Sequence, residues 1–493
     1  MATTLQRLPR STPAAQGIDP QAVQRFYHAL DREIRHMHSV MLIRHGHVIA
    51  EGWWSPYQPA DRHVLFSLSK SFTATAVGYA IGEGLFSLDD QVLGFFPAQA
   101  PAEPNDFLTA MRVRDLLSMT SGHGEDTLMS MFMQPEGDWI KGFLHQPVTH
   151  QPGSHFVYNS GATYMLSAIV QLKSGQTLLE YLEPRLFKPL GIRNPVWEVC
   201  PHGINVGGWG LSITTEDIAC FGQCYIQGGI WQGRQVVAAE WVAAASAIQA
   251  SNGSNPESDW EQGYGYQFWR CRHNAYRGDG AFGQFCVIIP EHDFIFAATA
   301  SVEDMQAVLN ILWREVLPGL HATPRPADAA ADAALANQLS TLALPVVSGA
   351  ATPLAGIAGR RYQFSPNEQQ LQAISFAPQQ DRIEISIHDD QGEHLLVAGV
   401  GSWAIGTTTF DARNPRLGGT KPPREEIPVG ISAAWRSSNT LAIQIWYTLT
   451  PFSIILECQF GGSDAAQLTL TPHLHVSFGP KDLPAMTATA VER

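Results

Sequence analysis

Ser67 and Lys70 are the two residues whose types and spacing suggest chemistry most directly. They form the only Ser-x-x-Lys in the chain, in an apolar stretch that predicts a buried helix, and Lys70 is one of only six lysines. Because residues three apart share one face of a helix, we expect the Ser67 hydroxyl to lie beside the Lys70 amine. Burial lowers the pKa of a lysine, and a neutral amine can accept the serine's proton. The pair predicts a nucleophile and its base. Alternatively, Ser67 only caps the helix and Lys70 extends its amine to the surface.

A serine–lysine pair needs a second group that carries a proton to the leaving group. The candidate is Tyr158, in the segment 152–161, where proline and glycine come before the tyrosine and a predicted helix follows it. This context predicts a loop from which the side chain can point into a cleft. A free phenol titrates near ~10, so we expect a cation such as Lys70 to favour its ionised form. Alternatively, Tyr158 is structural and its hydroxyl binds the backbone.

Acyl transfer also needs backbone N–H donors around the developing oxyanion. The glycine-rich strand over 277–284 could supply one donor, near Gly280 and Ala281, because glycine permits close backbone approach. The N–H of Ser67, at the positive start of its helix, would supply the other. A glycine-rich turn without any ligand is the alternative.

The predicted elements around these residues form a domain of mixed type. We expect helices over 20–36, from Ser67 to about 84, over 162–174 and over 303–317, and strands over 39–43, 48–54, 264–271, 282–289 and 294–301. Hairpin strands near the start and near residue 300 indicate one antiparallel sheet built from both ends of the domain, with helices inserted between them. The stretch 123–151 is predicted to be irregular, and its methionines at 128–133, with the thirteen tryptophans, suggest an apolar cleft.

The amino-acid composition of the chain changes after residue 320. Residues 321–348 are rich in proline and alanine, which predicts a linker with a short helix. Beyond it, apolar residues alternate with period two, as in Ile383, Ile385 and Ile387, which predicts an all-β domain. We therefore expect domains at 1–320 and 349–493, and the second one has no catalytic constellation. Its predicted role is to pack against the first or to shape a cleft.

Composition excludes several classes of partner. The chain has 493 residues, 45% of them hydrophobic and 15% charged, and its net charge of −14 is spread without an acidic or basic run. This argues against nucleic acid and anionic membranes as partners. No apolar stretch is long enough to span a membrane, and the first residues have no secretory core, so we expect a cytoplasmic protein. The six cysteines form no Cys-x-x-Cys, and three His-x-His pairs have no apparent third ligand, so no metal or cofactor is expected.

Several ordered motifs together carry a resemblance to one superfamily. They are Phe66-Ser67-Leu68-Ser69-Lys70-Ser71-Phe72, Leu88-Asp89-Asp90, the segment 116–122, Phe156-Val157-Tyr158-Asn159-Ser160-Gly161, the segment 208–212 and Gly263-Tyr264-Gly265. Over residues 15–318 the chain resembles the serine β-lactamases and penicillin-binding proteins, in particular class C β-lactamases, D-alanyl-D-alanine carboxypeptidases, D-aminopeptidases and family VIII esterases. The resemblance implies that Ser67 is acylated, that Lys70 is its base and that Tyr158 is the second acid/base.

The implied fold is α+β. It has a β-lactamase/transpeptidase-like antiparallel sheet flanked by helices, an inserted helical subdomain, and the C-terminal all-β domain in addition. Two departures from the family pattern bear on the substrate. The family has Tyr-x-Asn, whose asparagine contacts substrate and lysine, and here Ser160 stands at that third position. The family's Lys-Thr-Gly or His-x-Gly aligns with Gly278-Asp279-Gly280, which lacks the cation that binds a substrate carboxylate. Arg277 or Arg272 could substitute, but Asp279 would repel a carboxylate.

These observations predict a metal-independent serine hydrolase that forms an acyl-enzyme on Ser67. The expected substrate is a small or medium ester, amide or peptide, with Ser160, Gly280 and Ala281 binding it or its oxyanion. Two alternatives stay open. One is β-lactamase or D-alanyl peptidase activity, and the other is a non-catalytic binding protein of the same fold. The substrate's identity and the oligomeric state have no readable code in the sequence.

Overall fold

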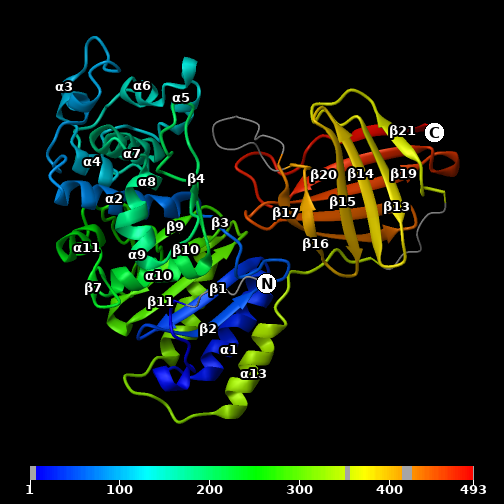
Figure 1. The fold of residues 1–493 in the computed structure, drawn as a ribbon, viewed down its shortest axis with the longest axis horizontal. Coiled ribbons are helices and arrows are strands. Elements are labelled where there is room, and N and C mark those ends of the chain that lie inside the picture. The colour runs from blue at the N-terminus through cyan, green and yellow to red at the C-terminus, as the bar shows by residue number, and fades with distance from the viewer. Residues whose placement is uncertain (1–6, 350–355, 413–424, 492–493) are drawn as a thin grey trace. The chain divides into compact units, whose positions relative to one another are not determined.

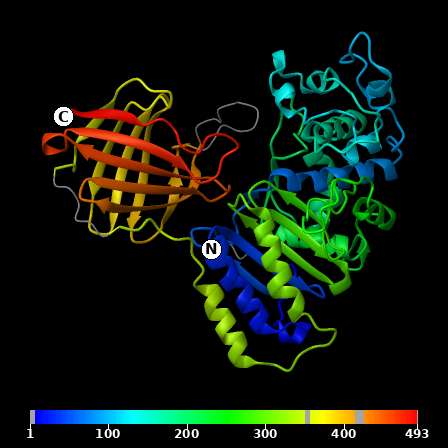
Figure 2. The same cartoon turned by 180° about the vertical axis from the view of Figure 1, so that it is seen from behind.

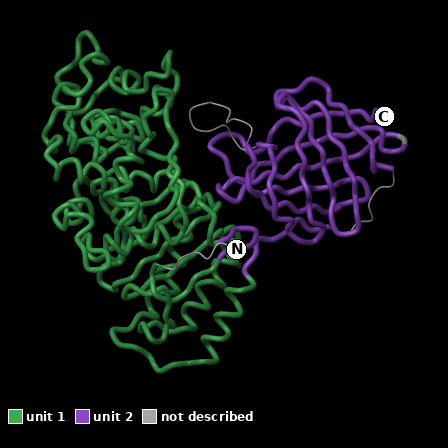
Figure 3. The backbone as a smooth tube through the Cα atoms, in the orientation of Figure 1, with its two compact units in different colours: residues 1–52, 59–341 green, residues 53–58, 342–493 purple. Residues whose placement is uncertain are grey.

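The computed structural model describes residues 7–349, 356–412 and 425–491. The chain forms two compact units (Figure 3). Unit 1 comprises residues 1–52 and 59–341, and unit 2 comprises residues 53–58 and 342–493. The helix α13 (Ala329–Ser340) belongs to unit 1. We predicted domains at 1–320 and 349–493 with a linker between them. That these two parts fold independently stays a prediction.

Unit 1 is built around a six-stranded sheet with the order β2-β1-β11-β10-β9-β8 (Figure 1). Its strands are β1 (Met37–Arg44), β2 (His47–Trp53), β8 (Trp269–Arg270), β9 (Tyr276–Gly280), β10 (Gln284–Ile289) and β11 (Phe294–Ala300). The strands β1 and β11 pair antiparallel, as do the neighbours from β11 to β8. Both ends of the unit therefore build one sheet, as predicted. The expected strand over 264–271 shortens to β8 because Gly263 and Gln267 take left-handed backbone angles.

Helices cover both faces of this sheet (Figure 2). Phe296 of β11 packs edge-on against Phe26 of α1 (Pro20–Ala29), whereas the neighbouring Ile295 faces Gly222 of α10 (Thr215–Ile226). Successive residues of a strand point to opposite faces, so α1 and α10 lie on opposite sides. The other elements outside the inserted region are η1 (Ala14–Gln16), η2 (Leu30–Ile34), β6 (Ile230–Trp231), β7 (Arg234–Gln235), α11 (Ala239–Ser246), η7 (Pro290–His292), α12 (Met305–Ile311), η8 (Leu312–Val316) and η9 (Leu317–Gly319).

A largely helical region is inserted between β3 (His63–Val64) and β5 (Leu211–Ile213), which pair in a small sheet with β4 (Val196–Trp197). Its elements are η3 (Phe66–Leu68), α2 (Ser69–Gly82), η4 (Val92–Phe95), α3 (Asp106–Ala110), α4 (Val113–Leu117), α5 (Leu128–Phe132), η5 (Pro135–Gly137), α6 (Trp139–Leu144), α7 (Ser160–Ser174), α8 (Leu178–Leu182), η6 (Glu183–Phe187) and α9 (Lys188–Leu190). The prediction of irregular chain over 123–151 is wrong where α5 and α6 form. Asp138 caps α6 by accepting a hydrogen bond from the Lys141 N–H at 3.0 Å.

Unit 2 is a ten-stranded sheet that closes through an additional pairing between β15 and β17. Its strands are β12 (Arg361–Phe364), β13 (Ala373–Pro378), β14 (Arg382–Asp389), β15 (Gly392–Val400), β16 (Ala404–Thr408), β17 (Ile427–Ser437), β18 (Thr440–Tyr447), β19 (Ser453–Gly461), β20 (Gln467–Leu474) and β21 (Met486–Val491), with the short turn η10 (Ser463–Ala465) before β20. Ile383, Ile385 and Ile387 are all buried, which confirms the period-two prediction. The segment 53–58 belongs to this unit, where the Tyr57 hydroxyl donates to the Thr450 carbonyl at 2.9 Å.

Two observations bear on the chain as a whole. Within the described ranges, no helix has the length and apolar character needed to cross a membrane. The six cysteines are all buried and unpaired.

Candidate active site

The structure brings Ser67 and Lys70 together at the junction of η3 and α2. Lys70 Nζ lies 3.0 Å from Ser67 Oγ, 3.3 Å from Ser160 Oγ and 2.8 Å from the Gly208 carbonyl oxygen. The lysine is 1% exposed, whereas Ser67 is only half-buried. The expected pairing of hydroxyl and amine is therefore present, and the hydroxyl keeps access to solvent.

The environment of Lys70 makes its amine easier to deprotonate than that of a free lysine. Burial lowers its pKa to about 8, although the carboxylates of Asp126 and Asp279 act in the opposite direction. An ammonium group can donate to all three neighbouring oxygens. A neutral amine keeps its bonds to Ser160 and Gly208 and turns its lone pair toward Ser67, whose hydroxyl then donates. Lys70 therefore has hydrogen-bond partners in either protonation state. A proton can move between Ser67 and Lys70 without leaving a buried polar atom unpaired.

The backbone around Ser67 is strained and crowded. Phe66, the residue before the serine, has a left-handed φ of 45°, a conformation that costs on the order of 1–3 kcal/mol for such a residue. Its ring packs at 5.8 Å, nearly perpendicular, on Phe282, which is itself left-handed. A Cβ on Gly280 would lie 1.9 Å from the Leu65 carbonyl oxygen. Only glycine therefore lets the end of β9, and Ala281 after it, approach the turn that carries Ser67.

Tyr158 faces the same site from the loop before α7. Its ring stacks on Trp269 at 5.0 Å, and Lys70 Nζ lies 4.8 Å from the ring centroid. Burial raises the pKa of Tyr158 well above its usual range, and Asp279 adds to this, while a hydrogen bond with Ser67 opposes it. The structure thus favours the protonated phenol, not the phenolate that we expected beside Lys70.

Ser160 and Asn159 have different surroundings. Ser160 begins α7, and its hydroxyl lies 3.3 Å from Lys70 Nζ. Asn159 is a structural cap, since its Oδ1 accepts hydrogen bonds from the N–H groups of Thr127, Gly161 and Ala162. The shift of asparagine by one residue therefore exchanges an amide for a hydroxyl beside the lysine.

The strand β9 carries a buried ion pair. Arg277 Nε donates to Asp279 Oδ2 at 2.8 Å, and these side chains are 0% and 6% exposed. Arg277 also donates to the Asp259 carbonyl and stacks on Trp260. Arg272 pairs with the Asp259 carboxylate at 2.7 Å. Both arginines that could have replaced the missing family cation are therefore engaged with other groups, and Asp279 has its own counter-ion.

Two groups that sequence reasoning did not assign also build the site. The carboxylate of Asp126 accepts from the Ser160 N–H at 3.0 Å, and it lies in a loop where no pattern points to a role. Gln267 is 2% exposed and joins three elements. Its side chain donates to the Leu116 and Leu117 carbonyls of α4 and accepts from Thr163 of α7, and its own carbonyl accepts from Ser71 of α2.

The histidines form no ligand set. His38 contacts His63, with 3.1 Å between ring nitrogens. Throughout the described part of the chain, no group of three or more His, Cys, Asp or Glu side chains could hold a metal ion.

Comparison with known proteins agrees with this geometry. A family model described as Beta-lactamase matches residues 30–317, which include Ser67, Lys70, Tyr158 and β9. The chain belongs to the beta-lactamase family.

Two curated relatives of this beta-lactamase-family protein are named as a hydrolase and an aminopeptidase. A 6-aminohexanoate-dimer hydrolase of Paenarthrobacter ureafaciens is 26% identical over 285 residues, which cover 54% of this chain and 72% of that protein. A D-aminopeptidase of Brucella anthropi is 28% identical over 173 residues, which cover 31% of each. Among solved structures, an octameric penicillin-binding protein homologue from Pyrococcus abyssi has a TM-score of 0.50 at 15% identity, over 95% of this chain and 99% of that one. This last likeness shows a common fold.

The ion pair on β9 generates a prediction about stability. Arg277→Met leaves the Asp279 carboxylate buried without its counter-ion, so we expect the free energy of unfolding to fall by about 3–5 kcal/mol. Arg314→Met is the control, because Arg314 is half-exposed in its pair with Glu33, and we expect a loss of at most about 1 kcal/mol. Urea unfolding followed by circular dichroism measures both. Arg277→Met/Asp279→Asn should recover much of the loss, and equal losses in the two single variants would contradict the prediction.

Proposed function

We propose that this protein is a serine hydrolase that forms an acyl-enzyme on Ser67 and cleaves a small or medium ester or amide. The observation that carries the proposal is the 3.0 Å contact between Ser67 Oγ and the buried Lys70 amine, whose pKa is lowered to about 8. A half-exposed hydroxyl beside such an amine has the two properties of an activated nucleophile, a base in contact and access to substrate.

The proposed acylation step gives each of these groups a defined role. Lys70 accepts the Ser67 proton while Oγ attacks the carbonyl carbon, and the carbonyl oxygen becomes an oxyanion. The N–H groups of Ser67 and Ala281 stabilise that oxyanion. Tyr158, held protonated by burial, donates its proton to the leaving oxygen or nitrogen as the bond to carbon breaks, and Lys70 then returns a proton to the phenolate. Water attacks the acyl-enzyme by the same path in reverse, and Ser67 regains its hydroxyl.

The two alternatives are less well supported. A purely binding protein has no need of a desolvated lysine in contact with a serine, because burying an amine costs free energy without adding to affinity. β-Lactamase or D-alanyl peptidase activity requires recognition of a carboxylate, and the side chain of Arg277 is fully buried against Asp279.

The proposed roles of the catalytic groups predict the effect of replacing them. Ser67→Ala should abolish hydrolysis of a nitrophenyl acyl ester, and Tyr158→Phe should lower kcat by about 10²–10⁴-fold, the range for a positioned acid or base. Lys70→Ala should nearly match Ser67→Ala, because the two residues act as a unit. Mass spectrometry after a fluorophosphonate probe should find the label on Ser67.

Matched variants control for general damage. Ser154→Ala removes an exposed serine of the neighbouring loop, and Tyr266→Phe removes a hydroxyl outside the Ser67 contacts. Both should keep the parent rate. A folded protein that hydrolyses the ester unchanged after Ser67→Ala would refute the proposed function, and an unchanged rate in Tyr158→Phe would make that tyrosine structural.

The pKa of Lys70 predicts the pH dependence. Lysine acts as a base only when neutral, so kcat/KM for a neutral ester should rise with pH and reach half its plateau near pH 8. Below that value the ammonium form dominates and activity falls. Because Asp126 favours the ammonium form, Asp126→Asn should move the midpoint to lower pH. The exposed Glu240, replaced by Gln, serves as the control. A profile that is flat through this region would contradict Lys70 as the base.

The charges on β9 predict substrate preference. Neutral esters should be cleaved well and the β-lactam nitrocefin poorly, because Gly278 stands at the position of the family's cation and the neighbouring Asp279 adds a negative charge. Loss of a charge-assisted hydrogen bond costs about 1.5–3 kcal/mol, or roughly one to two decades in rate. A panel of short-chain nitrophenyl esters, D-amino-acid amides, D-alanyl-D-alanine and nitrocefin measures this. Nitrocefin turnover that rivals ester turnover would contradict the prediction.

A further inference from the structure

Tyr158, the proposed acid, is held in place by aromatic rings. Its ring stacks on Trp269 of β8, with centroids 5.0 Å apart and planes at 23°. Tyr264 meets both rings edge-on, at 6.2 Å from Tyr158 and 4.9 Å from Trp269. A stacked face and a perpendicular edge leave a phenol few orientations. The position of the Tyr158 hydroxyl, which bonds Ser67, therefore depends on where the indole of Trp269 lies.

The indole of Trp269 is fixed in turn by β9. Trp269 pairs with Arg277 across the two antiparallel strands, and Asp279 lies two residues further along β9. Because cross-strand partners and residues two apart share a face of a sheet, the three side chains lie on one side. Asp279 accepts a hydrogen bond from the indole N–H, and Arg277 Cζ lies 5.8 Å from the indole centroid. Trp269 is only 8% exposed, so the indole has little freedom to move.

The ion pair between Arg277 and Asp279 holds the acceptor in place. Asp279 Oδ2 accepts from Arg277 Nε at 2.8 Å, and the same guanidinium donates to the Asp259 carbonyl at 2.6 Å. A carboxylate buried in this way is stable as an anion only beside its counter-ion. The ion pair therefore does more than stabilise the fold, because it supplies a fixed acceptor for the indole of Trp269.

We propose that Trp269 is a positioning residue for Tyr158, and that Asp279 acts through Trp269. The indole holds the phenol so that its hydroxyl stays on Ser67, and Asp279 holds the indole. Neither residue takes part in proton transfer itself. The proposal rests on the proposed hydrolase function and gives a role to Asp279, which the acylation step leaves unused.

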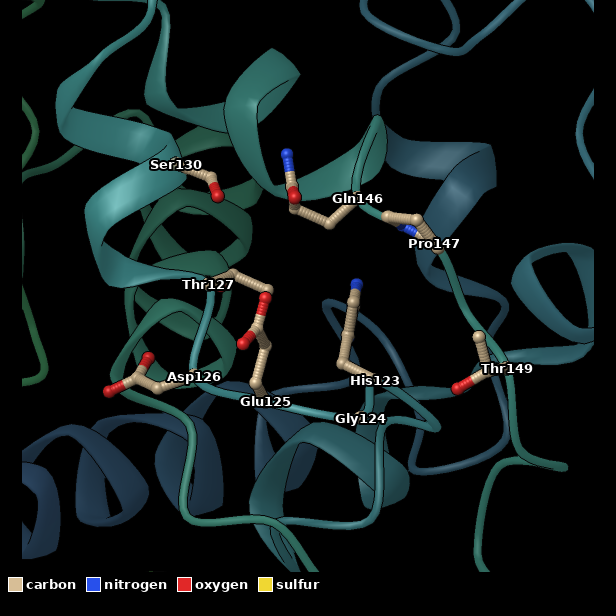
Figure 4. A pocket seen from close by; sticks show the side chains of 9 residues that line it. All are labelled: His123, Gly124, Glu125, Asp126, Thr127, Ser130, Gln146, Pro147 and Thr149. Atoms are coloured by element: carbon tan, nitrogen blue, oxygen red, sulfur yellow. The ribbon is translucent and has the colours of Figure 1, made fainter.

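Charged groups approach Tyr158 from three segments. Lys70 of α2 lies 4.8 Å from the ring centroid, and Arg277 and Asp279 act on it from β9. Asp126 comes from the loop before α5, and its carboxylate points away from the centre of the neighbouring pocket (Figure 4). The two carboxylates raise the pKa of Tyr158, and Arg277 lowers it. A test of position must therefore leave all four charges unchanged.

Replacement of Trp269 meets this condition. Trp269→Leu should lower kcat for a nitrophenyl acyl ester by about 10- to 100-fold, the effect of a small displacement of a reacting group, and leave KM within about twofold. Trp269→Phe keeps a ring for stacking and should recover most of the loss. In both variants kcat/KM should still reach half its plateau near pH 8, because Lys70 keeps its charged neighbours.

A double-mutant cycle separates positioning from general damage. Tyr158→Phe has no hydroxyl to position, so the addition of Trp269→Leu should lower its kcat by at most about twofold. Trp241→Leu is the matched control, because Trp241 is 7% exposed and also stacks on a tyrosine, Tyr266, at 5.8 Å. It should leave kcat unchanged in both backgrounds. An equal loss from Trp269→Leu with and without the Tyr158 hydroxyl, or no loss in either, would overturn the proposal.

A pair of variants tests the role of Asp279. In Arg277→Met/Asp279→Asn the ion pair is gone, but an amide oxygen can still accept from the indole. Arg277→Met/Asp279→Leu has the same charge and no acceptor. We expect its plateau kcat to be about three- to tenfold lower than that of the asparagine variant, the effect of one neutral hydrogen bond. Equal plateau values would overturn the role of Asp279.

NMR of the Tyr158 ring separates this proposal from the proposed function. The ring protons of a tyrosine stacked on an indole shift upfield, and the Tyr158 signals are assigned by their loss in Tyr158→Phe. The upfield shift should persist in Ser67→Ala and disappear in Trp269→Leu. Ester hydrolysis that survives Ser67→Ala would refute the proposed function, whatever the Tyr158 signal shows. A Tyr158 signal that does not move in Trp269→Leu would overturn the positioning role while leaving Ser67 as the nucleophile.

Discussion

The desolvation of one amine sets the requirements that the rest of the site meets. Lys70 is buried at the start of α2, and a buried ammonium ion is unstable without partners. Three oxygens from three separate segments surround it, from Ser67, Ser160 and Gly208. Each segment is held by further buried bonds. Thr73 of α2 donates to the Gly207 carbonyl, and the Leu211 N–H donates to Ser69 Oγ, so the strand after Gly208 is joined to the same helix. The reactive pair therefore depends on the packing of α2 against α7 and the segment 207–211.

Electrostatics divides the surroundings of Ser67 into two regions. Along β9 the charge is internally balanced, because Asp279 is paired with Arg277 and neither side chain is exposed beyond 6%. Beside Ser160 the charge is that of Asp126, whose carboxylate accepts from the Ser160 N–H and raises the pKa of Lys70. A substrate carboxylate would meet no available cation at β9 and would be repelled by Asp126. A neutral carbonyl meets no opposing charge at β9. Both regions thus disfavour the anionic substrates that a family cation on this strand would bind.

The sequence predicts those features that depend on local pattern. The Ser67–Lys70 contact follows from helical spacing, and the antiparallel sheet and the alternation in unit 2 follow from hydrophobic periodicity. Other features arise only from tertiary packing. Gln267 has a left-handed backbone and so interrupts a predicted strand. Its side chain forms hydrogen bonds with both α4 and α7. The protonation state of Tyr158 depends on burial and on Asp279, which no spacing reveals. Asp126 lies in a loop without periodicity, so its approach to Ser160 could not be foreseen.

The strained backbone at Phe66 links the packing of β9 to the geometry around Ser67. A left-handed Phe66 is disfavoured by itself and persists only where surrounding contacts outweigh its cost. Those contacts are the Phe282 ring, on the turn after β9, and the close approach of Gly280 to the Leu65 carbonyl. The same contacts bring Ala281 next to the nucleophile's turn, so the groups that impose the strain are also those proposed to hold the oxyanion. A side chain at residue 280 would separate β9 from η3, and the backbone of Phe66 could then relax. The glycines of β9, which bear no chemical group, are therefore as necessary to the geometry around Ser67 as the residues that react.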